Sequence, residues 1–136
     1  MSDVRHDIEG VLATYAHLYD HGRVDELGDL FVLDAVFEIR GIDGMPAVMR
    51  GRARIVETLA RRHAGTAAQR RHIVTNVRIQ QHGDRGCRVA SYLLLGSTDR
   101  KGSHLPATGT YEDRLVKSEG CWRFENRCLG LDAPLS

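Results

Sequence analysis

The chain has 136 residues, of which 42% are hydrophobic and 27% charged, and its formal net charge is +1. This length and composition predict one globular domain, 1–136, with a substantial core. A net charge this small gives no whole-protein field, so we expect neither nucleic acid nor a membrane surface as a partner. No apolar run is long enough to span a bilayer, and the charged first residues lack a signal-peptide apolar region, which predicts a cytoplasmic protein.

The N-terminal part of the chain has helical patterning. The apolar residues of the first segment recur with the 3.6-residue period of a helix: Ile8, Val11, Leu12, Tyr15 and Tyr19. Ser2 or Asp3 is placed to cap this helix, and Gly22 to end it. A short second helix is expected over 24–31 and a third over 53–63.

The remaining segments predict strands. A strand is expected over 35–39, and the glycine-rich loop 41–51, which contains Pro46, includes a short strand at 48–49. The long strands of the second half are expected over four segments: 71–80, 87–96, 107–117 and 121–129. Two of their connections are short and turn-rich, whereas the connection 97–106 is longer and polar.

Helices followed by a run of antiparallel strands are typical of an α+β domain. A strongly curved antiparallel sheet has a concave face that only the three N-terminal helices are available to cover. We therefore expect a cone-shaped fold that encloses a pocket between the helices and the sheet.

Two residues far apart in the sequence suggest chemistry. Asp20 ends the first predicted helix, and His72 begins the first long strand. A carboxylate that holds an imidazole fixes its tautomer and creates a general base that works near neutral pH. Each residue also has a structural interpretation, since a lone strand histidine is usually structural and a helix-end carboxylate is usually solvated. A negative charge at a helix C-terminus is unfavourable by about 0.3–1 kcal/mol, which suits a residue retained for another purpose.

Specific residues along the chain resemble a known family. They are Tyr19-Asp20, Leu30-Phe31, Asp34-Ala35-Val36-Phe37, Gly51, Arg71-His72-Ile73-Val74-Thr75-Asn76, Gly109-Thr110-Tyr111-Glu112-Asp113 and Trp122-Arg123-Phe124-Glu125-Asn126-Arg127. This pattern resembles the SnoaL-like group of the nuclear-transport-factor-type cone fold, which includes scytalone dehydratase and lindane dehydrochlorinase. The scaffold carries several chemistries and non-catalytic members, so the resemblance implies the fold more strongly than the activity.

The resemblance implies roles at single positions. His72 matches the family's base and Asp20 its orienting partner, while Arg127 matches an arginine that assists the leaving group in the dehydrochlorinase. Tyr15 stands where that enzyme has a lysine, which argues against the same halide elimination. Tyr15 or Tyr19 is suited to polarise a carbonyl, as tyrosines do in scytalone dehydratase, whose second histidine has no clear match here.

The face of the strand on which the Arg127 side chain lies depends on whether the alternation is unbroken. If Trp122 and Phe124 face the core, strict alternation along the strand sends Arg127 to the opposite face. A β-bulge between them would turn it inward again.

Four further residues are expected to bind substrate: Asn76, Val74, Tyr92 and Phe37. His17 and His21 have a metal-like spacing of four, but no neighbour supplies a further ligand, so we expect no metal and no cofactor. The recurring arginines, Arg62 and Arg70 among them, are interpreted as solvated surface.

The sequence thus predicts a cofactor-independent lyase or isomerase, that is a dehydratase, cyclase or double-bond isomerase. A His72–Asp20 pair would act on a small, apolar, cyclic or polyketide-like substrate. The alternatives are a non-catalytic ligand-binding or dimerisation module of the same fold and, with less support, a cone-fold epoxide hydrolase. An apolar outer sheet face with Ile73, Val77 and Ile79 predicts a homodimer or homotrimer.

Overall fold

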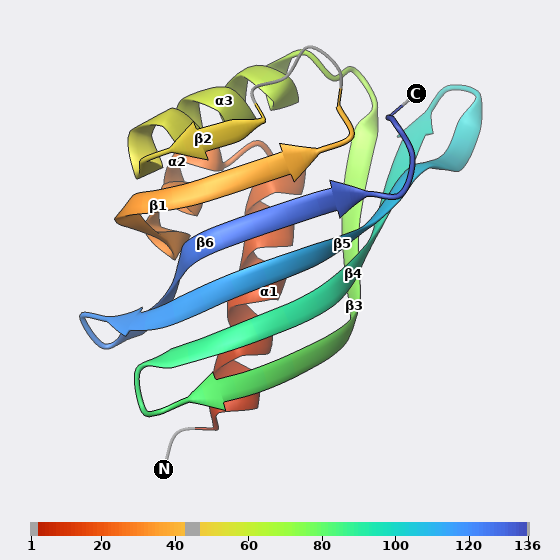
Figure 1. The fold of residues 1–136 in the computed structure, drawn as a ribbon. Coiled ribbons are helices and arrows are strands. Elements are labelled where there is room, and N and C mark those ends of the chain that lie inside the picture. The colour runs from red at the N-terminus through yellow and green to blue at the C-terminus, as the bar shows by residue number, and fades with distance from the viewer. Residues whose placement is uncertain (1–2, 43–46, 136) are drawn as a thin grey trace.

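The computed structural model describes residues 3–42 and 47–135, so Ser2 and Pro46 lie outside the described residues. Its elements follow the chain order shown in Figure 1: α1 (Val4–Asp20), α2 (Val24–Leu27), a 3₁₀ turn (Gly28–Leu30), β1 (Phe31–Arg40), β2 (Val48–Arg50), α3 (Arg52–Ala64), β3 (Gln69–His82), β4 (Gly86–Asp99), β5 (Gly102–Ser118) and β6 (Cys121–Leu131). Three helices thus precede the long strands, as the sequence predicted.

Helix α1 is closed at both ends by local hydrogen bonds. The side chain of Asp3 accepts a bond from the backbone N–H of His6 at the N-terminus. At the other end Gly22 adopts a left-handed φ of 74°, and the N–H of Arg23 reaches the carbonyl of Leu18 at 2.8 Å. This Schellman closure stops the helix just after Asp20 and fixes where its carboxylate lies.

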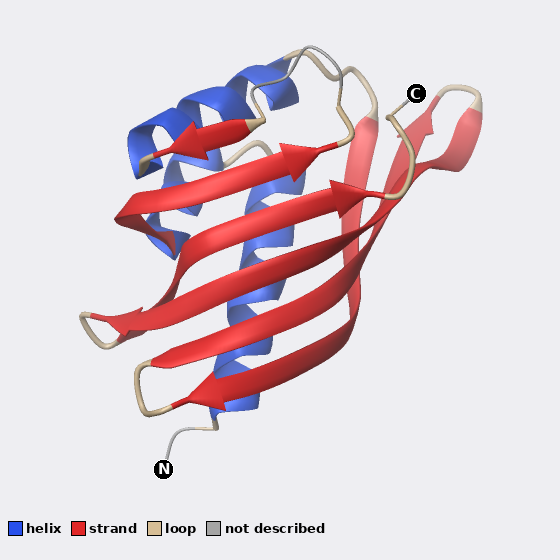
Figure 2. Cartoon of the chain, in the orientation of Figure 1, coloured by secondary structure: helices blue, strands red, loops and turns tan. Residues whose placement is uncertain are grey.

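The strands form one six-stranded sheet in the order β2-β1-β6-β5-β4-β3. All neighbouring pairs are antiparallel except β1 and β6, which run parallel and make the sheet mixed. The sheet is curved, and the helices lie together on one of its faces (Figures 1 and 2). The core between these two layers is rich in aromatic side chains: Tyr15, Phe31, Phe37, Tyr111, Trp122 and Phe124.

Two element boundaries differ from the sequence-based expectation. The predicted second helix splits, because α2 ends at Leu27, a 3₁₀ turn follows, and Phe31 already begins β1. The segment 97–106 is not a loop, since β4 and β5 continue through most of it as a projecting hairpin (Figure 1). Residues 98–105 of this hairpin are exposed, so its composition resembles that of a loop.

A β-bulge in β3 changes which residues face the helices. The pairing with β4 shifts between Thr75 and Arg78, and Asn76 takes a positive φ of 55°. Beyond the bulge Val77 and Ile79 pack against the core. The expectation that they share an apolar outer face with Ile73 is therefore wrong, because it assumed unbroken alternation.

The outer sheet face beyond this bulge is charged instead. Its side chains include Arg78, Arg88, Glu112 and Arg114, which line one shallow surface. Ile73 remains exposed on the sheet, and so does Tyr92 on the neighbouring strand. None of the helices described, in 3–42 or 47–135, is both long and apolar enough to cross a membrane.

Candidate active site

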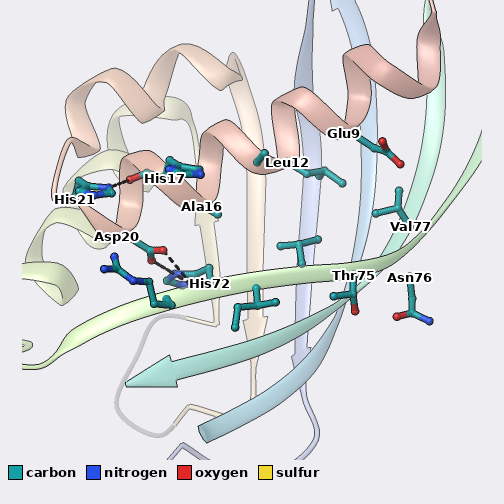
Figure 3. A pocket seen from close by; sticks show the side chains of 14 residues that line it. Glu9, Leu12, Ala16, His17, Asp20, His21, His72, Thr75, Asn76 and Val77 are labelled. Carbon is teal, nitrogen blue, oxygen red and sulfur yellow. Dashed lines mark hydrogen bonds and ion pairs between the residues drawn. The ribbon is translucent and has the colours of Figure 1, made fainter. Parts of the chain in front are cut away.

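The structure brings Asp20 and His72 into direct contact. His72 Nδ1 lies 2.6 Å from Asp20 Oδ1, and the two side chains are only 12% and 8% exposed, His72 first. Figure 3 shows the pair where the end of α1 meets the start of β3. The backbone N–H of His72 also donates to the same carboxylate, at 3.3 Å to Oδ1 and 3.1 Å to Oδ2.

This geometry sets the state of the imidazole. An ionised carboxylate only accepts hydrogen bonds, so Nδ1 carries the proton in the neutral ring. The other nitrogen, Nε2, is then the one that can accept a proton. Gln69 also donates from its side chain to the backbone carbonyl of Asp20 at 3.1 Å, which ties the helix end to the strand a second time.

Tyr19 and Tyr15 extend the site from α1 toward the core. The ring of Tyr19 stacks on the ring of His72, with centroids 4.8 Å apart. Tyr15 packs edge-on against Tyr19, with centroids 6.0 Å apart, and is itself fully buried. Burial raises the pKa of the Tyr15 phenol well above its ordinary value, so this phenol stays protonated and can donate a hydrogen bond.

An enclosed inner cavity of about 50 Å³ lies between these residues and the sheet. Its polar lining is formed by Tyr15, Tyr19, Arg62, His72 and Tyr111. Its apolar lining includes Phe37, Ile39, Leu59, Leu93, Leu95, Leu129 and Leu131. Both tyrosines of α1 thus face one cavity, with Phe37 where substrate binding was expected.

A second, outer pocket of about 60 Å³ adjoins the inner cavity. The two share Tyr19, Arg62, His72 and Leu95, and the outer pocket adds Asp20, Arg70 and three residues around the α3–β3 connection: His63, Thr66 and Ala68. The proposed base therefore stands at the junction of two compartments.

Arg62 and Arg70 were missed as site residues, although the sequence contains a signal for each. Arg62 follows Ile55 and Leu59 at i+7 and i+3, which places it on the inward face of α3. Arg70 alternates with His72 along β3 and so shares its face. Both were interpreted as solvated surface residues, because arginine side chains are usually exposed.

Arg127 faces inward because β6 contains the bulge that the alternation argument required. The pairing with β5 shifts by one residue between Phe124 and Asn126, so Phe124 and Arg127 both point to the core. The guanidinium carbon lies 3.6 Å from the ring centroid of Tyr111 and 4.3 Å from that of Tyr15. Arg127 is thus behind the tyrosines and is not among the residues lining the inner cavity.

Asp113 is the buried counter-ion of Arg127. Its Oδ2 lies 3.5 Å from Arg127 Nη1, both side chains are 0% exposed, and neither carboxylate oxygen accepts a hydrogen bond from a described residue. Burial raises the pKa of the Asp113 carboxyl from 3.8 to about 7, although the Arg127 charge lowers it in part. Sequence reasoning gave Asp113 no role, since alternation marks it as inward but cannot name its partner.

Three expected substrate-binding residues lie away from the inner cavity. Asn76 is the bulge residue at the far end of a surface groove between α1 and β3, as Figure 3 shows. Val74 lines this groove and packs against the core edge. Tyr92 is 54% exposed on the outer face, between the buried residues Ser91 and Leu93, so its assignment to the pocket is wrong.

His17 and His21 stack on the outside of α1, with ring centroids 6.2 Å apart. His21 Nδ1 lies 2.8 Å from the carbonyl of His17, which ties this ring to the helix end. Within 3–42 and 47–135 no group of three or more His, Cys, Asp or Glu residues is arranged to hold a metal ion.

Comparison with known proteins identifies the family. The model of the SnoaL-like domain matches residues 1–128, which is most of the chain. The protein belongs to the SnoaL-like family. A search of curated proteins gave no match.

Solved structures agree with this assignment. A protein from Catenulispora acidiphila, solved in complex with S-DNPA, is 27% identical, covers 95% of this chain and 93% of its own, and has a TM-score of 0.83. A variant of Rv3472, a protein of unknown function from Mycobacterium tuberculosis, is 25% identical over 93% of this chain and 70% of its own, with a TM-score of 0.81. Aln2 from a Streptomyces species, 23% identical over 97% and 93% of the two chains, has the same fold at a TM-score of 0.85.

The predicted family and fold class are therefore confirmed: this SnoaL-like chain has an α+β cone fold of the type that binds small molecules. A likeness to an NTF2-like protein from Novosphingobium aromaticivorans, 18% identical over 94% of this chain and 81% of its own with a TM-score of 0.83, supports the same fold.

The buried Asp113 gives a prediction for the pH dependence of stability. Because its pKa is higher in the folded than in the unfolded state, the associated stabilisation is complete below the ordinary value of 3.8 and is lost as the pH rises through about 7. The free energy of unfolding of the wild type should fall between these limits relative to Asp113→Asn, by at most about 1.4 kcal/mol per pH unit. Urea denaturation at several pH values measures this difference.

Asp84→Asn, a change in an exposed turn, is the control and should leave the pH profile of the wild type unchanged. Parallel profiles for the wild type and Asp113→Asn would contradict the raised pKa.

Proposed function

We propose that this protein is a cofactor-independent lyase or isomerase, a dehydratase, cyclase or double-bond isomerase, that removes a proton next to a carbonyl group. The observation that carries the proposal is the Asp20–His72 contact at the wall of an apolar cavity that also contains phenols. The apolar lining favours a small cyclic or polyketide-like substrate.

The first step assigns one task to each residue. Nε2 of His72 accepts the proton from carbon, and the C–H electron pair moves toward the carbonyl oxygen to give an enolate. Asp20 stabilises the imidazolium that forms, through the 2.6 Å contact with Nδ1. The phenol of Tyr15 or Tyr19 donates a hydrogen bond to the developing oxyanion. Loss of water, double-bond migration and ring closure can all follow from this enolate.

Arg127 takes an indirect role in this scheme. Its guanidinium lies against the rings of Tyr15 and Tyr111 and does not line the cavity, so it does not hold a leaving group directly. A fixed positive charge behind these tyrosines strengthens their phenols as hydrogen-bond donors, since it opposes the effect of burial on their pKa. Asp113 keeps that charge in place.

A non-catalytic ligand-binding module is the second candidate, favoured by the relative solved in complex with S-DNPA. The two candidates use the same cavity and differ in what His72 does. Self-association through the outer sheet face stays a prediction, with Ile73 and Tyr92 as its large exposed apolar side chains.

The role of His72 is tested by proton exchange. Wild-type protein should accelerate the exchange of the α-protons of a cyclic ketone such as 2-tetralone into deuterium oxide, followed by proton NMR. His72→Ala should lower this acceleration by about 10²–10⁴-fold, because the general base is lost. His82→Ala removes an exposed imidazole from the far end of the same strand and should leave the rate unchanged.

Equal rates for the wild type and His72→Ala would contradict catalysis by this residue. If the ketone still binds in both, that result favours the binding module.

The role of Tyr15 is tested in the same assay. Tyr15→Phe keeps the buried ring but removes the donor, so kcat should fall by about 10²–10³-fold with little change in KM. Tyr92→Phe makes the same change on the outer face and should behave as the wild type. An unaltered kcat in Tyr15→Phe would exclude its phenol as the oxyanion donor.

A further inference from the structure

The outer pocket contains two cations without an assigned task. Arg62 comes from the last turn of α3 and Arg70 from the start of β3, and both line the pocket beside His72. Among the described residues neither guanidinium takes part in an ion pair. Nε of Arg70 is also buried without a hydrogen-bond partner in the described part of the chain.

An orphaned, buried guanidinium nitrogen is costly unless a ligand satisfies it. The carboxylate of Asp20 lines the same pocket, but its hydrogen bonds go to the imidazole and the backbone N–H of His72, and it makes no ion pair with either arginine. Neither of the two positive charges facing this pocket is therefore neutralised by an ion pair with a described residue, Asp20 included.

We propose that Arg62 and Arg70 form a subsite for the carboxylate of an anionic substrate. Guanidinium groups match carboxylates in shape and charge, since their planar N–H donors can bind both oxygens. The ring of the substrate extends from this subsite toward the inner cavity, whose lining is mostly apolar. The inference rests on the proposed function for the reaction, but the binding it describes can be measured separately.

The arrangement also fixes where the reacting carbon lies. Arg62 and Leu95 belong to both compartments, and so do His72 and Tyr19. A substrate whose carboxylate reaches the outer pocket and whose ring extends toward the inner cavity places the carbon between them beside His72. The substrate class is thus a small acid whose ring carries the carbonyl group that the proposed reaction needs and is joined to the carboxylate by a short carbon chain.

Binding of charged and neutral probe pairs tests this assignment. Phenylacetate and 3-phenylpropanoate are titrated against their amides, phenylacetamide and 3-phenylpropanamide, by NMR of the ¹⁵N-labelled protein. The wild type should bind the acids about 10- to 100-fold more tightly than the amides, as expected for a charge-assisted pair. The shifts should centre on residues of the outer pocket.

Variants assign the preference to the two arginines. Arg62→Gln and Arg70→Gln should each reduce it about tenfold or more, while Arg62→Lys should retain part of it, since a lysine keeps the charge but loses the planar pair of donors. Arg61→Gln is the matched control, because Arg61 is exposed on the same helix turn and pairs with Glu57 at 2.7 Å. Inorganic phosphate should compete only weakly, because it lacks the apolar body; strong competition would show a site for free anions and overturn the substrate assignment.

Equal affinity for acid and amide in the wild type, or no binding of either at millimolar concentration, would overturn the proposal. So would an Arg62→Gln variant that weakens acid and amide alike. The two claims are separated in the wild type: an acid preference without exchange activity retains the subsite and rejects the proposed reaction. Exchange activity without an acid preference retains the proposed reaction and rejects the subsite.

Discussion

The site depends on one contact, the bond between the Asp20 carboxylate and the imidazole of His72. This carboxylate lies at the C-terminus of α1, where the helix dipole disfavours a negative charge, and it accepts both the ring and the backbone N–H of His72. The same interaction thus fixes the tautomer of the ring and the position of α1 relative to the edge strand β3. The cavity between helix and sheet follows from that placement.

Two bulges then decide which side chains reach the interior. The one in β6 turns Arg127 toward the core, where it supports Tyr15 and Tyr111 from behind. The one in β3 turns the later residues of that strand inward. The interior that results is apolar in its lining, holds phenols that burial keeps protonated, and contains the fully buried ion pair Arg127–Asp113. In such an interior, fixed hydrogen-bond donors stabilise a negative charge that develops on a bound ligand more strongly than water does.

Helical and strand periodicity, with the Asp20 and His72 motifs, predicted the fold class and the central pair. Alternation failed wherever a single extra residue entered a strand, because a bulge is decided by tertiary pairing and leaves little trace in composition. For that reason Asn76 was expected in the cavity and Val77 outside it. The expectation for Tyr92 failed for another reason. Alternation along its strand places Tyr92 on the face opposite to Leu93, and this was not taken into account. For Arg62 and Arg70 the periodicity was correct and indicated inward-facing side chains. They were nevertheless interpreted as solvated, because arginine is usually found at the surface.

In this site the Asp20 carboxylate holds the His72 ring with Nδ1 protonated and Nε2 free. The most direct measurement is a long-range ¹H–¹⁵N NMR correlation of the His72 ring in the wild type and in Asp20→Ala, which has no side-chain acceptor, at a pH where the ring is neutral. We expect the Nδ1–H tautomer in the wild type and a shift of the equilibrium toward Nε2–H in the variant. An Nε2–H tautomer in the wild type, or identical spectra for the two proteins, would contradict it.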